Sequence, residues 1–307
     1  EAAGKMALLE TNKKNEVLNC VAKNLIKDAK TLIAENAKDM EAGKANGMPE
    51  GLLDRLLLTE KRIEQMAEGL EQVAALDDPI GEVLSMKKRP NGLRIGQKRV
   101  PLGVVGIIYE ARPNVTADAF GLCFKTGNAV ILKGGSDALH SNIAIVASIR
   151  RTLAECGVDE NAIALIEDTS RETTTEFMKM NGYVDVLIPR GGAGLIRAVV
   201  ENATVPVIET GTGNCHIYVD ESADLDMAVN IIFNAKTQRI GVCNACESLV
   251  VHENIKDALL PKLAERLKEK NVEMRGDKAS QDACSDIIPA SDEDWGKEYL
   301  DYILSIK

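Results

Sequence analysis

The sequence has few aromatic residues and no excess of positive charge. Phenylalanine, tryptophan and tyrosine make up only 3% of the 307 residues, and the formal net charge is -10. Nucleic-acid binding usually requires a basic surface and rings on which bases stack, so this composition argues against it. No apolar run approaches the roughly 18 residues of a membrane span, and the first residues lack the apolar stretch of a signal peptide. We therefore expect a cytoplasmic protein that binds neither nucleic acid nor membrane.

Several sequence signatures of metal and nucleotide sites are also missing. The three histidines, His140, His216 and His252, are far apart and belong to no metal-binding pattern, so we expect no metal. The seven cysteines are odd in number and scattered, which favours reduced thiols. Neither a G-x-S-x-G elbow nor a G-x-x-x-x-G-K-[ST] loop is found, which argues against serine hydrolases and P-loop proteins.

The periodicity of apolar residues predicts two α/β domains preceded by helices. Apolar residues recur at helical spacing up to about residue 78. From residue 104 onward, strands alternate with helices, which is typical of a parallel sheet covered on both faces. We expect a doubly wound domain, with ligands bound at the carboxyl ends of its strands. Its expected strands are 104–109, 129–133, 162–166, 184–188 and 205–209, and its expected helices are 116–125, 138–155, 172–180 and 193–201.

The remaining residues predict the beginning of a second α/β domain. The first domain is expected to cover 1–210 and the second 211–307. The pattern predicts an irregular acidic segment at 277–294. Separately, we expect that sequence is missing at both ends of the chain. The second domain's expected strands are 216–219, 247–252 and 300–304, and its expected helices are 223–236 and 255–270.

A basic segment at 82–101 precedes the first sheet. It contains six lysines and arginines around the turn Pro90-Asn91-Gly92. Asn-Gly is a strong signal for a β-hairpin. Two interpretations remain open. The segment is either an anion site or an exposed hairpin that bridges subunits, and the second is favoured because charge runs are usually solvated.

Glycines follow two of the predicted strands. The first strand-to-helix turn, residues 110–114, lacks the G-x-G-x-x-G fingerprint of dinucleotide-binding proteins. The turns 133–136 and 190–194 contain glycines and open helices whose N-termini favour phosphate. Each is compatible with an ordinary tight turn. Because both turns are expected at the same edge of one sheet, they together favour a phosphate-binding site.

The cysteine loop at 238–247 is the strongest candidate for chemistry. Its backbone N–H groups can stabilise a thiolate at Cys243 and an oxyanion next to it. Cys246 completes a C-x-x-C, but no second ligand pair supports metal binding and the surroundings do not resemble a dithiol redox site. We interpret Cys246 as a buried core residue.

Three segments together resemble a known family. Residues 104–116, 125–135 and 234–245 are similar to the gamma-glutamyl phosphate reductases, the glutamate-5-semialdehyde dehydrogenases of proline biosynthesis. This family is a branch of the aldehyde dehydrogenase superfamily. The resemblance extends over essentially the whole chain and implies an aldehyde dehydrogenase-like fold with an NADP-binding domain, a catalytic domain without its C-terminal part, and an oligomerisation hairpin. The sequence departs from the family pattern at Ile240, where the family has proline.

The resemblance also implies roles for individual residues. It makes Cys243 the nucleophile, Asn114 an oxyanion donor and Glu209 a general base. Lys236 is a further candidate for the substrate's phosphate or α-carboxylate. The cofactor-binding residues are Lys133, Gly134, Ser136, Gly191 and Gly192, and the substrate-binding candidates are Arg112 and Arg239.

The implied reaction is the reduction of L-glutamyl 5-phosphate by NADPH through a cysteine thioester, in a homo-oligomer with a small-molecule substrate. Two alternatives stay open. One is a related aldehyde dehydrogenase that acts on another acyl phosphate or aldehyde, and the other is a non-catalytic protein that retains the fold.

Overall fold

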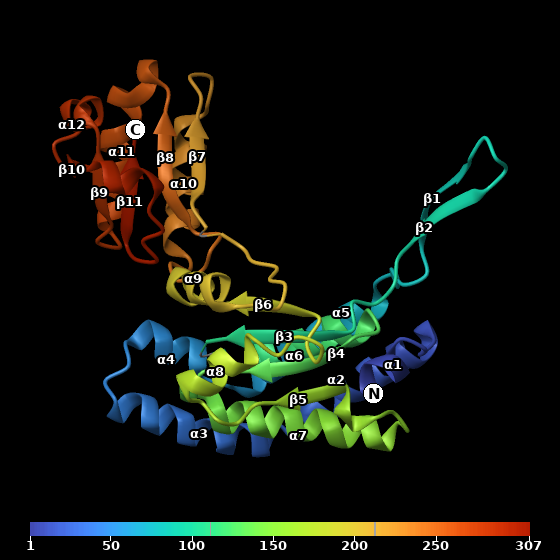
Figure 1. Cartoon of the computed structure of the whole chain (residues 1–307). Coiled ribbons are helices and arrows are strands. Elements are labelled where there is room, and N and C mark those ends of the chain that lie inside the picture. Colours follow the sequence, from blue (N-terminus) through green and yellow to red (C-terminus); the bar gives the residue numbers. More distant parts are fainter. Residues whose placement is uncertain (111, 212) are drawn as a thin grey trace. The chain divides into compact units, whose positions relative to one another are not determined.

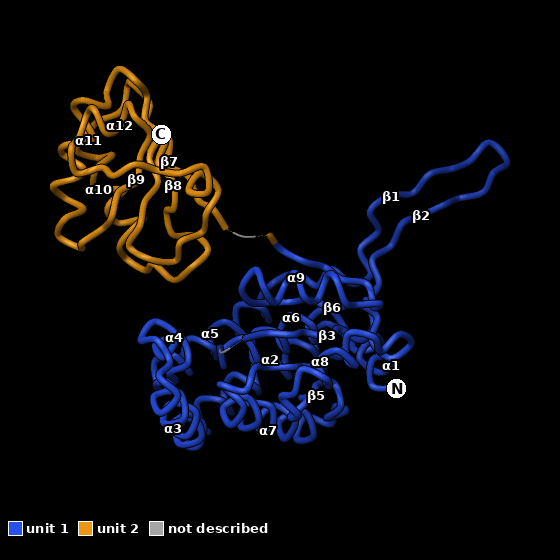
Figure 2. Tube along the Cα trace, turned by 60° about the vertical axis from the view of Figure 1, so that its left-hand side comes forward, with its two compact units in different colours: residues 1–210 blue, residues 211–307 orange. Residues whose placement is uncertain are grey.

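A computed structural model describes residues 1–110, 112–211 and 213–307. The chain divides into two compact units, Glu1–Thr210 and Gly211–Lys307, each of which is described by itself (Figure 2). This boundary coincides with the one expected from the sequence. Within the described residues, no helix combines the length and the apolar character needed to cross a membrane.

Helices form the N-terminal part of the first unit. Apolar residues one turn apart on α2, such as Val17, Val21 and Leu25, are fully buried, as the helical periodicity predicts. Helix α5 begins after Thr59, whose hydroxyl accepts a hydrogen bond from the Arg62 N–H at 3.2 Å. These helices are α1 (Ala2–Met6), α2 (Thr11–Lys27), α3 (Ala29–Ala45), α4 (Glu50–Leu56) and α5 (Glu60–Ala75).

A four-stranded parallel sheet lies at the centre of the first unit, in the order β5-β4-β3-β6. Its strands are β3 (Val104–Tyr109), β4 (Ala129–Lys133), β5 (Ile163–Leu165) and β6 (Val186–Arg190). The helical segments that follow them are α6 (Asn114–Lys125), η1 (Ser136–Ala138), α7 (Leu139–Glu155), η2 (Glu160–Ala162), α8 (Arg171–Phe177) and α9 (Ala193–Asn202).

Helices cover both faces of this sheet (Figure 1). Side chains of β3 alternate between the faces, as a strand requires. Val105 and Ile107 join the core that α2, α5, α6 and α7 share. Ile108 joins a second core with Phe177 of α8 and Val199 of α9. The predicted α/β fold with a parallel sheet wound on both faces is confirmed.

The expected strand at 205–209 is wrong as a full strand. Among the described residues, this segment forms only an isolated bridge between Leu187 and Val207, supported by hydrogen bonds from Leu187 N to Pro206 O at 2.8 Å and from Ile208 N to Leu187 O at 2.9 Å. Pro206 has no N–H to donate to a ladder, which limits the pairing to this short contact.

The second unit contains a parallel sheet in the order β10-β9-β11-β8-β7. Leu249, Leu263 and Leu304 lie in its buried core. The strands are β7 (Cys215–Val219), β8 (Cys246–Val251), β9 (Glu273–Gly276), β10 (Ile288–Pro289) and β11 (Ile303–Ile306). The helical segments are α10 (Leu225–Thr237), η3 (Glu253–Ile255), α11 (Lys256–Lys268), α12 (Lys278–Ala283) and η4 (Asp292–Gly296).

The segment 277–294 is more regular than expected, because two of its acidic residues cap helical turns. Asp277 accepts from the Ser280 N–H at 2.8 Å at the start of α12. Asp294 accepts from the Ser291 N–H at 2.7 Å in the capping box of η4. The last strand starts at residue 303 rather than 300, and Leu300 has a left-handed φ of 54° that interrupts extended backbone.

Residues 82–101 form an antiparallel hairpin of β1 (Val83–Lys88) and β2 (Arg94–Lys98), which projects from the rest of its unit in Figure 1. Gly92 at the turn has φ 88°, a conformation that glycine adopts without steric cost. Apolar side chains are exposed along it, with Met86 at 62% and Ile95 at 52% of full exposure. The hairpin therefore presents apolar surface as well as basic charge.

Candidate active site

The two cysteines of the C-x-x-C occupy different environments. Cys243 is exposed in the loop between α10 and β8. Cys246 is buried as the first residue of β8, and its thiol donates to the Ser248 carbonyl at 3.4 Å. Burial raises the pKa of Cys246 to about 11, so this thiol is protonated at neutral pH. Cys243 is the accessible sulfur of the pair.

Residues 213–215 pack against the backbone of Cys243. A Cβ added at Gly213 would lie 2.6 Å from the Cys243 carbonyl oxygen and 3.0 Å from its Cβ. The Cys215 thiol donates to the same carbonyl at 3.4 Å. A Cβ at Gly211, in contrast, would meet nothing within 4 Å. Gly213 is therefore the position where the absence of a side chain allows the cysteine loop to approach.

Asn214 lies between these two contacts. Both polar atoms of its side chain are buried, and neither has a hydrogen-bond partner among the residues that the structure describes. Such groups carry a desolvation penalty of roughly 1–3 kcal/mol, so they are uncommon in folded proteins. The sequence gives no sign of this unpaired amide.

The two basic candidates near the cysteine loop differ in their exposure to solvent. Arg239 is exposed two residues after α10. Lys236 is fully buried, and its ammonium donates to the Glu247 carboxylate at 2.7 Å. This buried pairing contradicts the interpretation of Lys236 as a substrate-binding group, because the charge is already neutralised inside the unit.

In the first unit, the register of the sheet brings three turns to one edge. Ile108 pairs with Lys133, and Tyr109 pairs with Arg190. The turns that begin at Glu110, Gly134 and Gly191 therefore follow neighbouring parallel strands. This is the carboxyl edge at which such sheets bind ligands.

Asn114 is the first residue of α6 and is exposed. Its amide nitrogen donates to the Asp118 carboxylate one helical turn further along, at 3.1 Å. An amide nitrogen carries two N–H groups, so one remains for another acceptor. Arg112, two residues earlier, is also exposed.

A carboxylate occupies the expected phosphate position at the N-terminus of α9. The Gly192 N–H donates to Glu110 Oε2 at 3.1 Å. A Cβ at Gly191 would lie 2.7 Å from the Glu110 side chain and 2.8 Å from that of Leu195. This turn thus already holds an anionic oxygen, as a phosphate site would. Glu110 was not among the sequence candidates, although a carboxylate directly after a strand at this edge is a signal for it.

Lys133 ends β4 and is buried, with its ammonium donating to the Gly134 carbonyl at 3.2 Å. Burial lowers the pKa of Lys133, and the Asp168 carboxylate opposes this shift. A Cβ at Gly134 would lie 2.4 Å from Asn142 Nδ2, a buried donor without a partner in the described part of the chain. Ser136 is exposed in the next turn.

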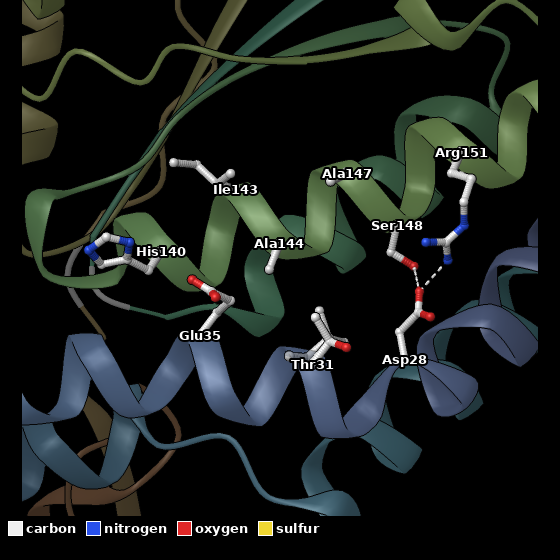
Figure 3. A pocket seen from close by; sticks show the side chains of 10 residues that line it. Asp28, Thr31, Glu35, His140, Ile143, Ala144, Ala147, Ser148 and Arg151 are labelled. Atoms are coloured by element: carbon white, nitrogen blue, oxygen red, sulfur yellow. Dashed lines mark hydrogen bonds and ion pairs between the residues drawn. The ribbon is translucent and has the colours of Figure 1, made fainter.

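Glu209 is exposed beyond the bridge at Val207, near the end of the first unit. A pocket of about 270 Å³ lies elsewhere in that unit, between α3 and α7 (Figure 3). Asp28 at one end of this pocket accepts from the Ser148 hydroxyl at 2.6 Å and forms an ion pair with Arg151. None of the sequence candidates lines it.

Comparison with known proteins agrees with this architecture. The family model described as the aldehyde dehydrogenase family matches residues 1–303. Gamma-glutamyl phosphate reductase from Lachnospira eligens is 60% identical over the whole chain, which covers 74% of that protein. The chain is likewise 60% identical over its whole length to the Moorella thermoacetica reductase, of which it covers 73%.

Solved structures give the same result. The crystal structure of gamma-glutamyl phosphate reductase from Thermotoga maritima matches with a TM-score of 0.92 and 47% identity, over 100% of this chain and 74% of that one. The Saccharomyces cerevisiae enzyme matches with a TM-score of 0.63 and 27% identity, over 100% and 77%. The chain belongs to the aldehyde dehydrogenase family and, within it, to the gamma-glutamyl phosphate reductases.

Proposed function

We propose that the chain performs the reaction of this family through Cys243. The reaction is the NADPH-dependent reduction of L-glutamyl 5-phosphate to L-glutamate 5-semialdehyde and phosphate, the second step of proline biosynthesis from glutamate. The observation that carries the residue assignment is the contrast within the C-x-x-C. Cys243 is exposed on a loop packed against Gly213, whereas Cys246 is buried with a raised pKa.

The first step is acyl transfer to sulfur. The Cys243 thiolate attacks the acyl carbon, and the resulting oxyanion accepts hydrogen bonds from the Cys243 N–H and the Asn114 amide. The C–O bond to phosphate then breaks and leaves a thioester on Cys243. The second N–H of Asn114, not engaged by Asp118, is the donor assigned to this task.

When bound at the carboxyl edge of the first sheet, NADPH would supply the hydride that reduces the thioester carbon. The Cys243 N–H and the Asn114 amide stabilise the oxyanion again, and its collapse expels the Cys243 thiolate with release of the semialdehyde. We also assign the carboxylate of Glu209 to this active site. Because departure of phosphate needs no activated water, Glu209 has no step of its own in this reaction.

The cofactor assignment rests on the carboxyl edge of the first sheet. We assign the pyrophosphate to the N–H groups of Gly191 and Gly192, where the Glu110 carboxylate stands in for an anion. Lys133 and Ser136, with Gly134 between them, are assigned to the adenosine ribose and its 2′-phosphate. A positive charge at Lys133 supports the choice of NADPH.

Arg112 and Arg239 are assigned to the anionic groups of the substrate, its phosphate and its α-carboxylate. Both are exposed, and the guanidinium fork matches either anion in bidentate geometry. We also propose that the protein is a homo-oligomer associated through the β1–β2 hairpin. Its exposed apolar residues, such as Met86 and Ile95, support contact with another subunit.

The test of the function is the reverse reaction, the oxidation of glutamate 5-semialdehyde by NADP⁺. We expect it to require inorganic phosphate, because phosphate must accept the acyl group from Cys243. Equal activity without phosphate would identify a different aldehyde dehydrogenase instead. If Cys243 reacts with iodoacetamide no faster than Cys20 and NADPH does not bind, the chain is a non-catalytic member of the family.

A further inference from the structure

The buried ion pair of Lys236 and Glu247 has no part in the reaction described above. The ammonium and carboxylate are 2.7 Å apart, and their side chains are 0% and 1% exposed. Removing two charges from water is costly, and apolar residues often stabilise such a site equally well. A buried pair therefore calls for a role other than stability alone.

The pair joins the two ends of the cysteine loop. Lys236 lies in the last turn of α10, and Glu247 is the second residue of β8. The segment 237–246 between them contains Cys243. The pair thus fixes the distance between the helix end and the strand start from which the loop emerges.

Glu247 also holds a second segment. Its other carboxylate oxygen accepts from the Leu300 N–H at 3.1 Å, where the chain takes the left-handed φ of 54°. Its carbonyl accepts from the Ser305 hydroxyl of β11 at 3.2 Å. One residue therefore connects the cysteine loop to the chain that enters the last strand.

Hydrogen bonds also form within the loop and to a neighbouring segment. They include the turn from Ala245 N to Val242 O at 3.1 Å and the weak donation from Cys215 to the Cys243 carbonyl at 3.4 Å. We propose that Lys236 and Glu247 are a positioning pair, which holds the Cys243 loop in the geometry required for nucleophilic attack.

The inference rests on the proposed nucleophile, and the experiment separates the two. The variants are Lys236→Met, Glu247→Gln and the double variant Lys236→Met/Glu247→Leu, which restores an apolar core if the single variants fail to fold. Lys262→Met is the matched control, because its ion pair with Asp226 is solvent-exposed. The readouts are kcat, the KM for NADP⁺, the alkylation rate of Cys243 and the melting temperature.

We expect folded variants of the pair to lose about 100-fold in kcat, the cost typical of a misplaced reacting group, with the KM for NADP⁺ unchanged. Cys243 alkylation should slow in the same variants, and Lys236→Arg should recover part of the loss. Unchanged kcat and alkylation in the double variant would overturn the positioning role. Absence of Cys243-dependent turnover in the unaltered protein would instead overturn the proposed function.

A different observation concerns Cys20 and Cys156 in the first unit. Helices α2 and α7 meet in a regular antiparallel ladder. The Asp28 carboxylate accepts a hydrogen bond from the Ser148 hydroxyl at 2.6 Å, and Figure 3 marks this contact with a dashed line. One turn earlier on α2 lies Asn24, and one turn later on α7 lies Thr152; the Asn24 amide donates to the Thr152 hydroxyl at 2.9 Å. One further turn along each helix leads to Cys20 on α2 and to Cys156 at the C-terminal end of α7.

The two thiols meet at this step. The ladder of contacts between α2 and α7 places these two thiols next to each other, and both are free and partly exposed. Burial, followed by the contact with Cys20, raises the pKa of Cys156 to about 11. We infer that Cys20 and Cys156 form an oxidisable dithiol site, separate from the catalytic sulfur, which closes to a disulfide that links α2 to α7.

With hydrogen peroxide as oxidant, the reaction is balanced as follows. A sulfur of the pair attacks a peroxide oxygen and becomes a sulfenic acid as the O–O bond breaks. The second sulfur then attacks the first, its proton leaves with the displaced hydroxide as water, and the S–S bond forms. In total two thiols are oxidised and one peroxide is reduced to two waters.

In the test, the Cys243→Ser protein is treated with hydrogen peroxide. The substitution ensures that the sulfur of Cys243 does not contribute to the result. Peptide mapping without reductant should find Cys20 linked to Cys156, and dithiothreitol should reverse the link. The oxidised form should melt at a higher temperature, because the link closes a long loop. In Cys20→Ser, Cys156 should form no such link. Oxidation of the two sulfurs to separate adducts, or links only between molecules, would overturn the proposal.

Discussion

Replacing Gly213 by alanine tests the geometry of the cysteine loop. The added Cβ would lie 2.6 Å from the Cys243 carbonyl oxygen, about 0.8 Å closer than ordinary van der Waals contact begins. It would also lie 3.2 Å from the Cys243 Cα. The obstructing atoms include backbone, so a side-chain rotation cannot relieve the overlap. The loop must move away from residue 213.

Displacement of a reacting group by about 1 Å can cost roughly 100-fold in rate. We therefore expect Gly213→Ala to lower kcat by about 100-fold, equivalent to about 2.7 kcal/mol of transition-state stabilisation. Because the cofactor is assigned to the first unit, the KM for NADP⁺ should stay near that of the unaltered protein.

The control is Gly211→Ala, where the new Cβ would meet nothing within 4 Å. Both changes restrict the unfolded chain in the same way, so that contribution cancels in the comparison. The assay measures NADP⁺ reduction with glutamate 5-semialdehyde and phosphate, together with the alkylation rate of Cys243 by mass spectrometry. Equal kcat in the two variants would refute the packing of residue 213 against Cys243.

Three further changes test other parts of the account. Asn114→Ala removes an oxyanion donor, which typically costs about 2.7–4 kcal/mol, so kcat should fall by roughly 100-fold or more while the melting temperature changes little. Glu110→Gln removes the carboxylate that occupies the Gly192 N–H, so NADPH should bind more tightly in a fluorescence titration, and weaker binding would contradict the assignment. The Ser291 N–H is the main cause that holds the pKa of Asp294 well below its usual range. A carboxyl whose pKa is lowered by folding stabilises the protein at pH values above its ordinary pKa, and this stabilisation is lost as the pH falls through the folded pKa. Asp294→Asn should therefore lower the melting temperature at pH 7 and have little effect on it in strong acid.

The sequence predicted regular elements well where periodicity and chemistry agreed. Strands 104–109 and 129–133 have the predicted bounds, because apolar runs between turn residues have little alternative in a doubly wound sheet. The strand at 205–209 was overpredicted, because β-branched residues outweighed the missing N–H of Pro206. The acidic residues at 277–294 suggested an irregular segment, whereas Asp277 and Asp294 cap helical turns.

The chemistry of the site was less accessible to sequence reasoning. A lysine such as Lys236 is expected at the surface, and its burial depends on Glu247, whose role only the fold reveals. Glu110 at the N-terminus of α9 and the unpaired amide of Asn214 likewise depend on contacts between distant strands and turns. The roles of Cys243 and Asn114 stay predictions, supported by exposure and by family membership.

The most direct test of the central claim is a single-turnover experiment without phosphate. Glutamate 5-semialdehyde and NADP⁺ are mixed with the protein, and NADPH formation is followed while the protein is digested and mapped by mass spectrometry. The account predicts a burst of about one NADPH per active subunit, a hydroxylamine-sensitive glutamyl thioester on Cys243, and renewed turnover when phosphate is added. A burst that persists in Cys243→Ser, or a thioester on another cysteine, would contradict it.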